Sequence, residues 1–182
     1  MIILIPIGDV DTAIINYLQD AIIKELHTRV VVESRIDVPR VAYNAERNQY
    51  LATIVLDSLT KYTKPDAKLL GVTNVDLYVP NLNFVFGIAS GIPGNRCVIS
   101  LHRLYPRFYG EKHDEELFKL RVLKEAIHEL GHLYGLMHCP NPKCVMHFSN
   151  SILDTDYKSY RFCKRCLTKL RGKIFKPHLE DK

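Results

Sequence analysis

Apolar residues in the first part of the chain occur in a short run and then at helical spacing. Residues 2–7 are almost entirely apolar, which is typical of a buried β-strand. Asp9 or Asp11 can then cap a helix, because a short carboxylate accepts hydrogen bonds from the first free amides. The inward-facing positions of this helix are predicted to be Ile14, Ile15, Leu18, Ile22 and Leu26. The pattern therefore predicts a strand followed by an amphipathic helix.

The next segment repeats this alternation. Residues 29–33 contain three consecutive valines and predict a second strand, and Pro39 interrupts the loop that follows. Asn44 is predicted to cap a helix that reaches about residue 60. Its inward-facing positions are predicted to be Leu51, Ile54, Val55 and Leu59. Residues 68–72 predict a third strand.

Two further strands are predicted close together. Residues 84–89 form a short apolar segment that carries Gly87, and residues 97–101 form another, with a glycine- and proline-rich turn between them. Helical connections between the early strands favour parallel pairing, whereas a short turn favours an antiparallel pair. We therefore predict an α/β fold with a twisted, mixed, mostly parallel five-stranded sheet and an antiparallel edge strand.

A long helical pattern begins near His113 or Asp114. Its apolar stripe, predicted to pack on the sheet, consists of Leu117, Leu120, Leu123, Ile127, Leu130 and Tyr134. After Gly135 the prolines at 140 and 142 break regular structure, and a basic helix is predicted over residues 163–175.

The long helix also carries a metal-binding pattern, HExxHxxGxxH, from His128 to His138. His128 and His132 are four residues apart and share a helix face, so both rings can reach one ion. Gly135 can end the helix and turn the chain, which lets His138 return as the third ligand. Glu129 is placed beside the metal, where a base for metal-bound water belongs.

Three protein ligands leave one position of a tetrahedral zinc open, which is typical of a catalytic site. Neutral imidazoles suit zinc, although copper or nickel could bind the same three nitrogens. The alternative interpretation of HExxH alone is a helix with two surface histidines, but the spaced glycine and third histidine favour the metal.

Composition places few limits on this picture. The chain has 182 residues, with 47% hydrophobic and 25% charged, which is ordinary for a globular domain. No apolar run is long enough to cross a membrane, and the short apolar start lacks a basic leader. We therefore expect a cytoplasmic, monomeric protein without a membrane partner, in which the cysteines are reduced.

Positive charge is concentrated near the C-terminus. The net charge is +5, and eight basic residues with no acidic residue lie between 158 and 176. Such a segment could bind nucleic acid or an acidic partner. The favoured interpretation is the solvated face of one helix, so a nucleic-acid partner is not expected.

Four of the five cysteines form two pairs. Cys139 and Cys144 are followed by Cys163 and Cys166, a spacing that suits a structural zinc with a closed coordination sphere. A redox Cys-x-x-Cys and two disulfides remain as alternatives. The fifth, Cys97, is predicted to be a small buried hydrophobe.

Taken together, these motifs resemble the archaemetzincins, a family of metzincin zinc metallopeptidases. Besides the histidine and cysteine motifs, the similarity covers residues 6–8, 42–50, 76–80 and 83–87. The resemblance implies two zinc ions per chain, one catalytic and one structural, and makes Met146 the Met-turn beneath the histidines. It also implies an edge strand above the cleft, which would bind an extended peptide through Phe84, Val85, Phe86, Gly87 and Ile88.

The resemblance implies a metzincin-like fold, with the helix from Asn44 as the backing helix behind the active-site helix. Residues 1–138 would form the catalytic subdomain and residues 139–182 a small zinc-stapled subdomain, within one compact domain. The predicted activity is hydrolysis of peptides or proteins, as an endopeptidase or aminopeptidase, with Glu129 as general base. The alternatives are a zinc protein that binds peptides or nucleic acid without efficient turnover, and a protein with cysteine redox chemistry.

Overall fold

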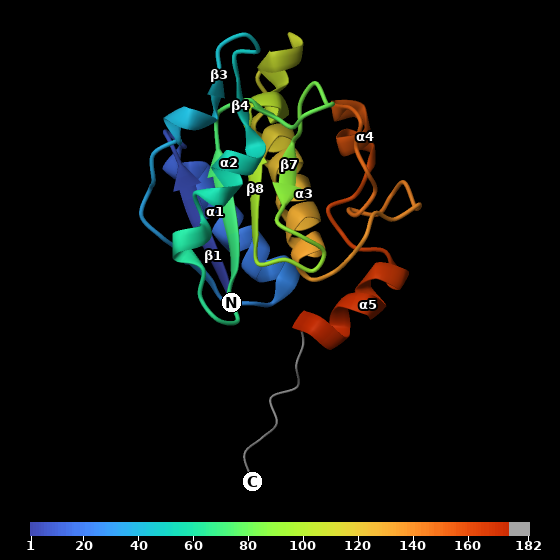
Figure 1. The fold of residues 1–182 in the computed structure, drawn as a ribbon. Coiled ribbons are helices and arrows are strands. Elements are labelled where there is room, and N and C mark those ends of the chain that lie inside the picture. Colours follow the sequence, from blue (N-terminus) through green and yellow to red (C-terminus); the bar gives the residue numbers. More distant parts are fainter. Residues whose placement is uncertain (175–182) are drawn as a thin grey trace.

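The computed structural model describes residues 1–174, in which a five-stranded sheet forms the centre of the fold (Figure 1). The strands in spatial order are β2 (Val30–Val32), β1 (Ile2–Ile7), β5 (Lys68–Thr73), β8 (Arg96–Ser100) and β7 (Gly87–Ala89). All neighbours are parallel except β7 and β8, which are antiparallel. The predicted sheet, including its antiparallel edge, is therefore confirmed.

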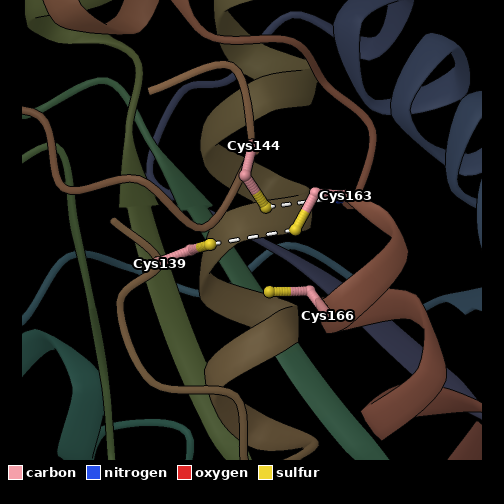
Figure 2. A group of neighbouring side chains, drawn as sticks. All are labelled: Cys139, Cys144, Cys163 and Cys166. Carbon is pink, nitrogen blue, oxygen red and sulfur yellow. Dashed lines mark hydrogen bonds between the residues drawn. The ribbon is translucent and has the colours of Figure 1, made fainter. Parts of the chain in front are cut away.

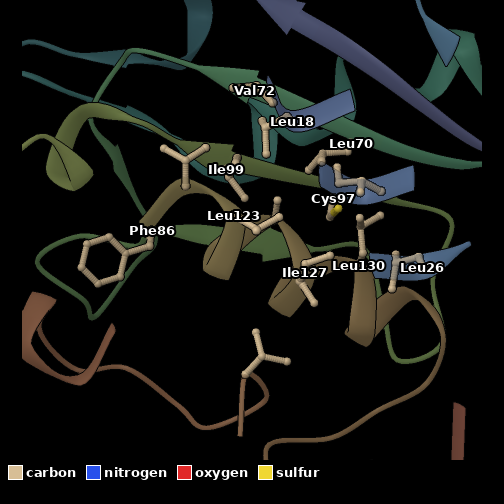
Figure 3. Close-up of a cluster of buried hydrophobic side chains, with 14 of the residues drawn as sticks. Leu18, Leu26, Leu70, Val72, Phe86, Cys97, Ile99, Leu123, Ile127 and Leu130 are labelled. Carbon is tan, nitrogen blue, oxygen red and sulfur yellow. The ribbon is translucent and has the colours of Figure 1, made fainter. Parts of the chain in front are cut away.

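Helices cover both faces of this sheet. On one face, α1 (Thr12–Leu26) and α3 (Glu115–Leu133) pack on alternate strand residues such as Leu70 and Ile99 (Figure 3). On the other face, α2 (Ala52–Asp57) packs on the intervening residues, among them Leu69 and Val98. Both faces of the central strands are buried, because side chains alternate between the two faces of a parallel sheet that carries helices on each.

Helix α1 follows the predicted pattern closely. Asp11 is its N-cap, and Oδ1 of Asp11 accepts a hydrogen bond from the Ala13 amide at 2.8 Å. The buried residues of the helix are the five that periodicity predicted: Ile14, Ile15, Leu18, Ile22 and Leu26.

The predicted start of the second helix, at Asn44, is wrong. Asn44 belongs to β3 (Tyr43–Asn44), which pairs with β4 (Gln49–Leu51), and α2 begins only at Ala52. The Asn44 side chain accepts a hydrogen bond from the Arg47 amide, and Asn48 adopts a positive φ of 52°. These features make a hairpin turn. A further strand, β6 (Leu77–Tyr78), completes a small three-stranded sheet with β3 and β4 that periodicity did not predict.

Two other expectations need correction. The strand predicted over residues 84–89 is regular only from Gly87, and Val85 instead forms an isolated bridge with Leu77 of β6. The helix that packs against α3 is α1, because α2 covers the opposite face of the sheet, so the backing helix is not the one from Asn44.

The apolar stripe of α3 is wider than predicted. Asp114 caps the helix as expected, but Leu117 and Leu120 are only half-buried, while Phe118 and Val122 are buried. Every residue from 121 to 133 is buried, including the charged residues Arg121, Lys124 and Glu125. The reason is that the C-terminal segment covers the side of α3 that faces away from the sheet.

This C-terminal segment contains α4 (Ile152–Tyr157) and α5 (Lys164–Ile174). The basic helix predicted over residues 163–175 is thus present as α5. Residue 175, and residue 176 at the end of the predicted basic segment, lie outside the described residues. Short 3-10 helices span Arg40–Ala42, Thr60–Tyr62, His102–Leu104 and Pro106–Tyr109.

Buried residues from both sides of residue 138 belong to one hydrophobic cluster. The division of the chain into two subdomains at this residue stays a prediction. In residues 1–174 no helix has the length and apolarity to span a bilayer.

Candidate active site

Helix α3 brings His128 and His132 together on one face, one turn apart. Their Nε2 atoms lie 3.1 Å from each other, and one ring nitrogen from each of His128, His132 and His138 lies within 4.8 Å of the other two. Nitrogens about 2.0–2.1 Å from a tetrahedral zinc are separated by about 3.3 Å. The spacing therefore fits a single metal ion.

The chain turn that brings in His138 depends on Gly135. Helix α3 ends at Leu133, Gly135 adopts a left-handed φ of 84°, and the amide of Leu136 bonds to the carbonyl of Gly131 at 3.0 Å. A glycine occupies this conformation without the steric cost of a Cβ atom. The predicted role of Gly135 in ending the helix is confirmed.

Backbone carbonyl groups orient the two helical histidines. Nδ1 of His128 lies 2.8 Å from the Val145 carbonyl oxygen, and Nδ1 of His132 lies 2.7 Å from that of Leu136. Each Nδ1 must therefore carry the proton, which leaves both Nε2 atoms as lone-pair donors facing each other. Two such lone pairs at 3.1 Å repel unless a cation lies between them, so the donor set itself fits a metal.

The surroundings keep these rings neutral. Burial lowers the pKa of His128 well below its usual range, and the charge of Lys158 acts in the same direction. Burial also lowers the pKa of His132 and that of His138. Neutral imidazole is the form that binds metal, so the site is prepared for one at neutral pH.

Glu129 lies beside the three histidines and is 5% exposed. Burial raises its pKa to about 8, and the nearby charge of Glu125 adds to the effect. A Cβ atom at Gly87 would lie 2.8 Å from Cγ of Glu129, so the absence of a side chain in β7 makes room for the carboxyl group. A pKa near neutrality suits a group that accepts and returns a proton.

These residues line a cleft of about 470 Å³. One side is formed by the edge-strand region, which contributes all five residues predicted to contact a peptide: Phe84, Val85, Phe86, Gly87 and Ile88. Other lining residues are His128, Glu129, His132 and His138, together with Phe148, Ser149 and Asn150 from beyond the Met146 turn. The sequence-predicted site residues of the edge strand and of α3 are thus brought into one cavity.

An ion pair in this region was not predicted from the sequence. Glu125, which also lines the cleft, is bound by Nζ of Lys158 at 3.0 Å, and the two side chains are 4% and 0% exposed. The Thr155 hydroxyl donates to the same Glu125 oxygen at 3.2 Å. Glu125 lies four residues before Glu129 on the same helix face, and this spacing could have indicated that Glu125 faces the site. Nothing in the local sequence identifies Lys158 as its partner.

The four paired cysteines form a second cluster. Their sulfur atoms point toward one another from the loop after α3 and from the start of α5 (Figure 2), and all lie within 4.8 Å. Sγ of Cys139 and Sγ of Cys163 are 3.8 Å apart. A tetrahedral zinc bound to sulfurs at about 2.3 Å separates them by about 3.8 Å, whereas a disulfide bond measures about 2.05 Å.

One thiol of this cluster is readily ionised. Burial alone raises the pKa of Cys163, but hydrogen bonds from the Cys166 amide and the neighbouring thiols outweigh it and lower the pKa to about 7. A thiolate among four converging sulfurs could bind a metal ion, and this arrangement favours metal over redox chemistry. Cys97 lies apart from the cluster, fully buried in the core as predicted (Figure 3).

Both clusters share one loop. Cys139 follows His138 directly, and its amide bonds to the Met146 carbonyl oxygen at 2.8 Å. Val145 in the same turn orients His128, and the ring of His147 bonds to the Cys139 carbonyl oxygen at 2.9 Å. The position of the third histidine is therefore coupled to the cysteine cluster.

Comparison with known proteins gives this arrangement a family. The model of peptidase family M54 matches residues 9–172. The archaemetzincin of Pyrococcus furiosus is 50% identical, covering 96% of this chain and 94% of the relative, and that of Methanocaldococcus jannaschii is 48% identical, covering 92% and 91%.

Solved structures agree. The archaemetzincin of Methanopyrus kandleri superposes with a TM-score of 0.84 at 39% identity, covering 97% of this chain and 96% of that one. The archaemetzincin of Archaeoglobus fulgidus, solved with malonate, gives a TM-score of 0.80 at 40% identity, covering 93% and 99%. The chain belongs to peptidase family M54, the archaemetzincins, and is therefore a zinc metallopeptidase.

Proposed function

We propose that the chain hydrolyses peptide bonds in the cleft between β7 and the Met146 turn, with Glu129 as the group that moves the proton. The observation that carries this proposal is a buried carboxyl group beside three imidazoles whose free nitrogens converge. A cleft used only for binding has no need of such a base next to its metal ligands.

His128, His132 and His138 would hold the catalytic zinc through their free ring nitrogens. The chemistry that zinc supplies when bound is Lewis acidity, which lowers the pKa of a water molecule and polarises a carbonyl group. The backbone carbonyl groups of Val145 and Leu136 keep the two helical rings in the required tautomer.

Glu129 would act first as base and then as acid. In its ionised form a carboxylate oxygen accepts the proton of the attacking water, and the protonated carboxyl then donates that proton to the departing amine nitrogen. Burial raises the pKa of Glu129 in the metal-free site, which favours the protonated carboxyl that returns the proton to the amine. Gly87 leaves the space in which the carboxyl group can do so.

The substrate would lie along the free edge of β7. The backbone groups of Phe86 and Ser90 point toward β8: the Ser100 amide donates to the Phe86 carbonyl oxygen, and the Ser90 amide donates to the Arg96 carbonyl oxygen. Alternate residues of an antiparallel strand point to opposite edges, so Gly87 and Ala89 present their amide and carbonyl groups to the cleft. An extended peptide could pair there as a further strand.

Cys139, Cys144, Cys163 and Cys166 would hold a second zinc with a structural role, because four thiolates close its coordination sphere. Met146 would form the floor beneath the histidines. The expectations of a monomer, a cytoplasmic location and no nucleic-acid partner stay predictions.

The test is a peptide-library cleavage assay with zinc-loaded wild type, Glu129→Gln and Glu116→Gln. Glu116 is an exposed acid on the first turn of the same helix and provides the matched control. We expect Glu129→Gln to keep its metal content but lose at least a hundredfold in rate, since it cannot carry the proton. The Glu116→Gln protein should cleave as wild type does. Equal cleavage by all three proteins would exclude Glu129 as the base, and the cleaved bonds distinguish an endopeptidase from an aminopeptidase.

A further inference from the structure

A second pocket, of about 380 Å³, lies next to the cleft at the start of α4. Phe84 and Asn150 line both the cleft and this pocket, so the pocket continues the cleft between the same two walls. Of the site residues predicted from the sequence, only Phe84 lines it. The other residues of this α4 pocket come from the segment before α3 and from the start of α4: Arg103, Tyr109, Glu111, Ser151, Ile152 and Leu153.

The two charged side chains of the α4 pocket already have partners in the protein. Nε and Nη2 of Arg103 each donate to a carboxylate oxygen of Asp76 at 2.8 Å. The carboxylate of Glu111 lies 3.2 Å from Nη2 of Arg121. The Arg103 guanidinium also lies over the ring of Phe84, 4.4 Å from its centroid. An ionic ligand group would therefore leave water without gaining an unpaired counter-charge, which costs free energy.

The rest of the pocket surface is apolar, and part of it is open to water. Leu153 is 72% exposed and Tyr109 is 37% exposed, although both side chains are large and apolar. Exposed apolar side chains that gather in a hollow beside an active site are typical of a ligand-binding surface. Covering them with an apolar group removes this surface from water, which is favourable.

The walls of the α4 pocket are held in place by hydrogen bonds within the protein. On one side, the Tyr109 hydroxyl donates to the Arg103 carbonyl oxygen at 2.9 Å. On the other side, the amides of Asn150 and Ser151 both donate to one carboxylate oxygen of Asp154 at 3.0 Å. Such preorganised walls lose little conformational entropy when a ligand binds.

A peptide paired with β7 would reach this pocket. The Glu129 carboxyl group lies against Gly87, and Phe84 comes three residues before Gly87. An extended chain covers this separation in about 10 Å, at about 3.3 Å per residue. Antiparallel pairing is more stable per residue than parallel pairing, so the peptide would run from β7 toward Phe84 in its own N-to-C direction. The second or third residue after the cleaved bond would then lie beside the α4 pocket.

We infer that the α4 pocket binds a large apolar side chain at the second or third residue after the cleaved bond of a peptide substrate, with Leu153 as a specificity-determining residue. An aliphatic or aromatic side chain there would be buried together with Leu153 and Tyr109, whereas an acidic or basic one would lose its hydration without a free partner. This inference rests on the proposed peptidase function.

The test measures binding by calorimetry to the zinc-loaded protein, so it does not depend on turnover. The probes are alanine tripeptide amides that carry a malonyl hydroxamate at the N-terminus to bind the zinc. Leucine replaces alanine at the first, second or third residue, or at none. The proteins are wild type, Leu153→Gln, Leu153→Met, which stays apolar, and Val41→Gln. Val41 is the matched control, because it is 81% exposed and lines neither the cleft nor the α4 pocket.

We expect leucine at the second or third residue to tighten binding to wild type about tenfold relative to the all-alanine probe. In Leu153→Gln this gain should fall below about threefold, whereas Leu153→Met and Val41→Gln should keep it. The all-alanine probe should bind all four proteins equally, since Leu153 is largely exposed and its replacement leaves the fold intact. A wild-type gain that is absent, or confined to the first residue, would overturn the inference, and so would a full gain in Leu153→Gln.

The same titration distinguishes this inference from the proposed function. If wild type binds the tripeptide probes no more tightly than acetohydroxamate, the cleft takes no peptide, and both are overturned. If the leucine gain depends on Leu153 but no library peptide is cleaved, only the hydrolytic proposal fails. Cleavage without a preference that depends on Leu153 overturns the inference alone.

Discussion

The Sδ atom of Met146 occupies the space that a side chain at Gly131 would need. A Cβ atom at Gly131 would overlap this sulfur and would also lie 3.2 Å from Cε of Met146. Gly131 lies in α3 between Glu129 and His132, so a glycine inside this helix lets the Met146 turn approach His128 and His132 closely.

We expect Gly131→Ala to lower the free energy of unfolding by about 1–3 kcal/mol, because overpacking outweighs the gain in helix propensity of about 1 kcal/mol. It should also weaken zinc binding at the histidines, since Val145 beside Met146 orients His128. Urea unfolding and zinc titration measure both effects. Combining Gly131→Ala with Met146→Ala should cost less than the sum of the single changes, and strict additivity would contradict the contact.

A second glycine lies against the carboxyl group of Glu129. A Cβ atom at Gly87 would lie 2.8 Å from Cγ and 2.9 Å from Oε1 of Glu129. We expect Gly87→Ala to reduce kcat/KM at least about tenfold through a displaced Glu129, with the zinc content unchanged. Gly91→Ala, where a Cβ would meet only the Pro93 backbone at 3.2 Å, serves as the control in the same cleavage assay. A Gly87→Ala enzyme as active as this control would show that Glu129 tolerates the added methyl group.

The buried pair of Glu125 and Lys158 should contribute to stability only while both partners remain. Removing one partner of a buried ion pair leaves an uncompensated charge, so Lys158→Met should cost about 3–5 kcal/mol in urea unfolding. Lys64→Met breaks the Lys64–Glu33 pair, whose side chains are 54% and 35% exposed, and should cost less than about 1 kcal/mol. Similar losses of unfolding free energy in the two variants would contradict the prediction that the cost of breaking an ion pair depends on its burial.

Loss of a cysteine from the cluster should affect both proposed metal sites. Cys163→Ser removes one of four converging thiols, and Cys139 of the same cluster adjoins His138. We expect the zinc content to fall from two ions per chain to one or fewer, with an unfolding temperature lower by at least about 10 °C. Cys97→Ala, in the core and outside the cluster, should keep both ions when measured by elemental analysis. Unchanged zinc in Cys163→Ser would argue against a metal at these thiols.

The stability of the metal-free protein should depend on pH through Glu129. Burial raises the pKa of this group from 4.5 to about 8, so the folded state holds a proton that the unfolded chain releases. Its contribution to stability is complete below pH 4.5, declines as the pH rises, and is lost above about pH 8. Denaturant unfolding from pH 5 to 9 should therefore show Glu129→Gln gaining stability relative to wild type as the pH rises. Parallel curves for the two proteins would contradict the raised pKa.

Periodicity predicted the elements whose signals are local. The five buried positions of α1 and the cap at Asp11 were visible because helical spacing repeats every three to four residues. The start of α2 was not visible, since Asn44 suits a helix cap and a hairpin turn equally well. Only the pairing of β4 with β6, from a distant part of the chain, decides between them.

The same division holds for the site. The sequence alone determined which residues could bind metal, because His128 and His132 share a helix face through their spacing and the cysteines occur as close pairs. Tertiary structure decided what surrounds them: Gly87 beside Glu129, Met146 under Gly131, and Lys158 against Glu125. Each of these contacts joins segments that approach only when the sheet, α3 and the C-terminal loop pack together. Spacing along a helix is a local property of the chain, whereas burial and contact depend on the whole fold.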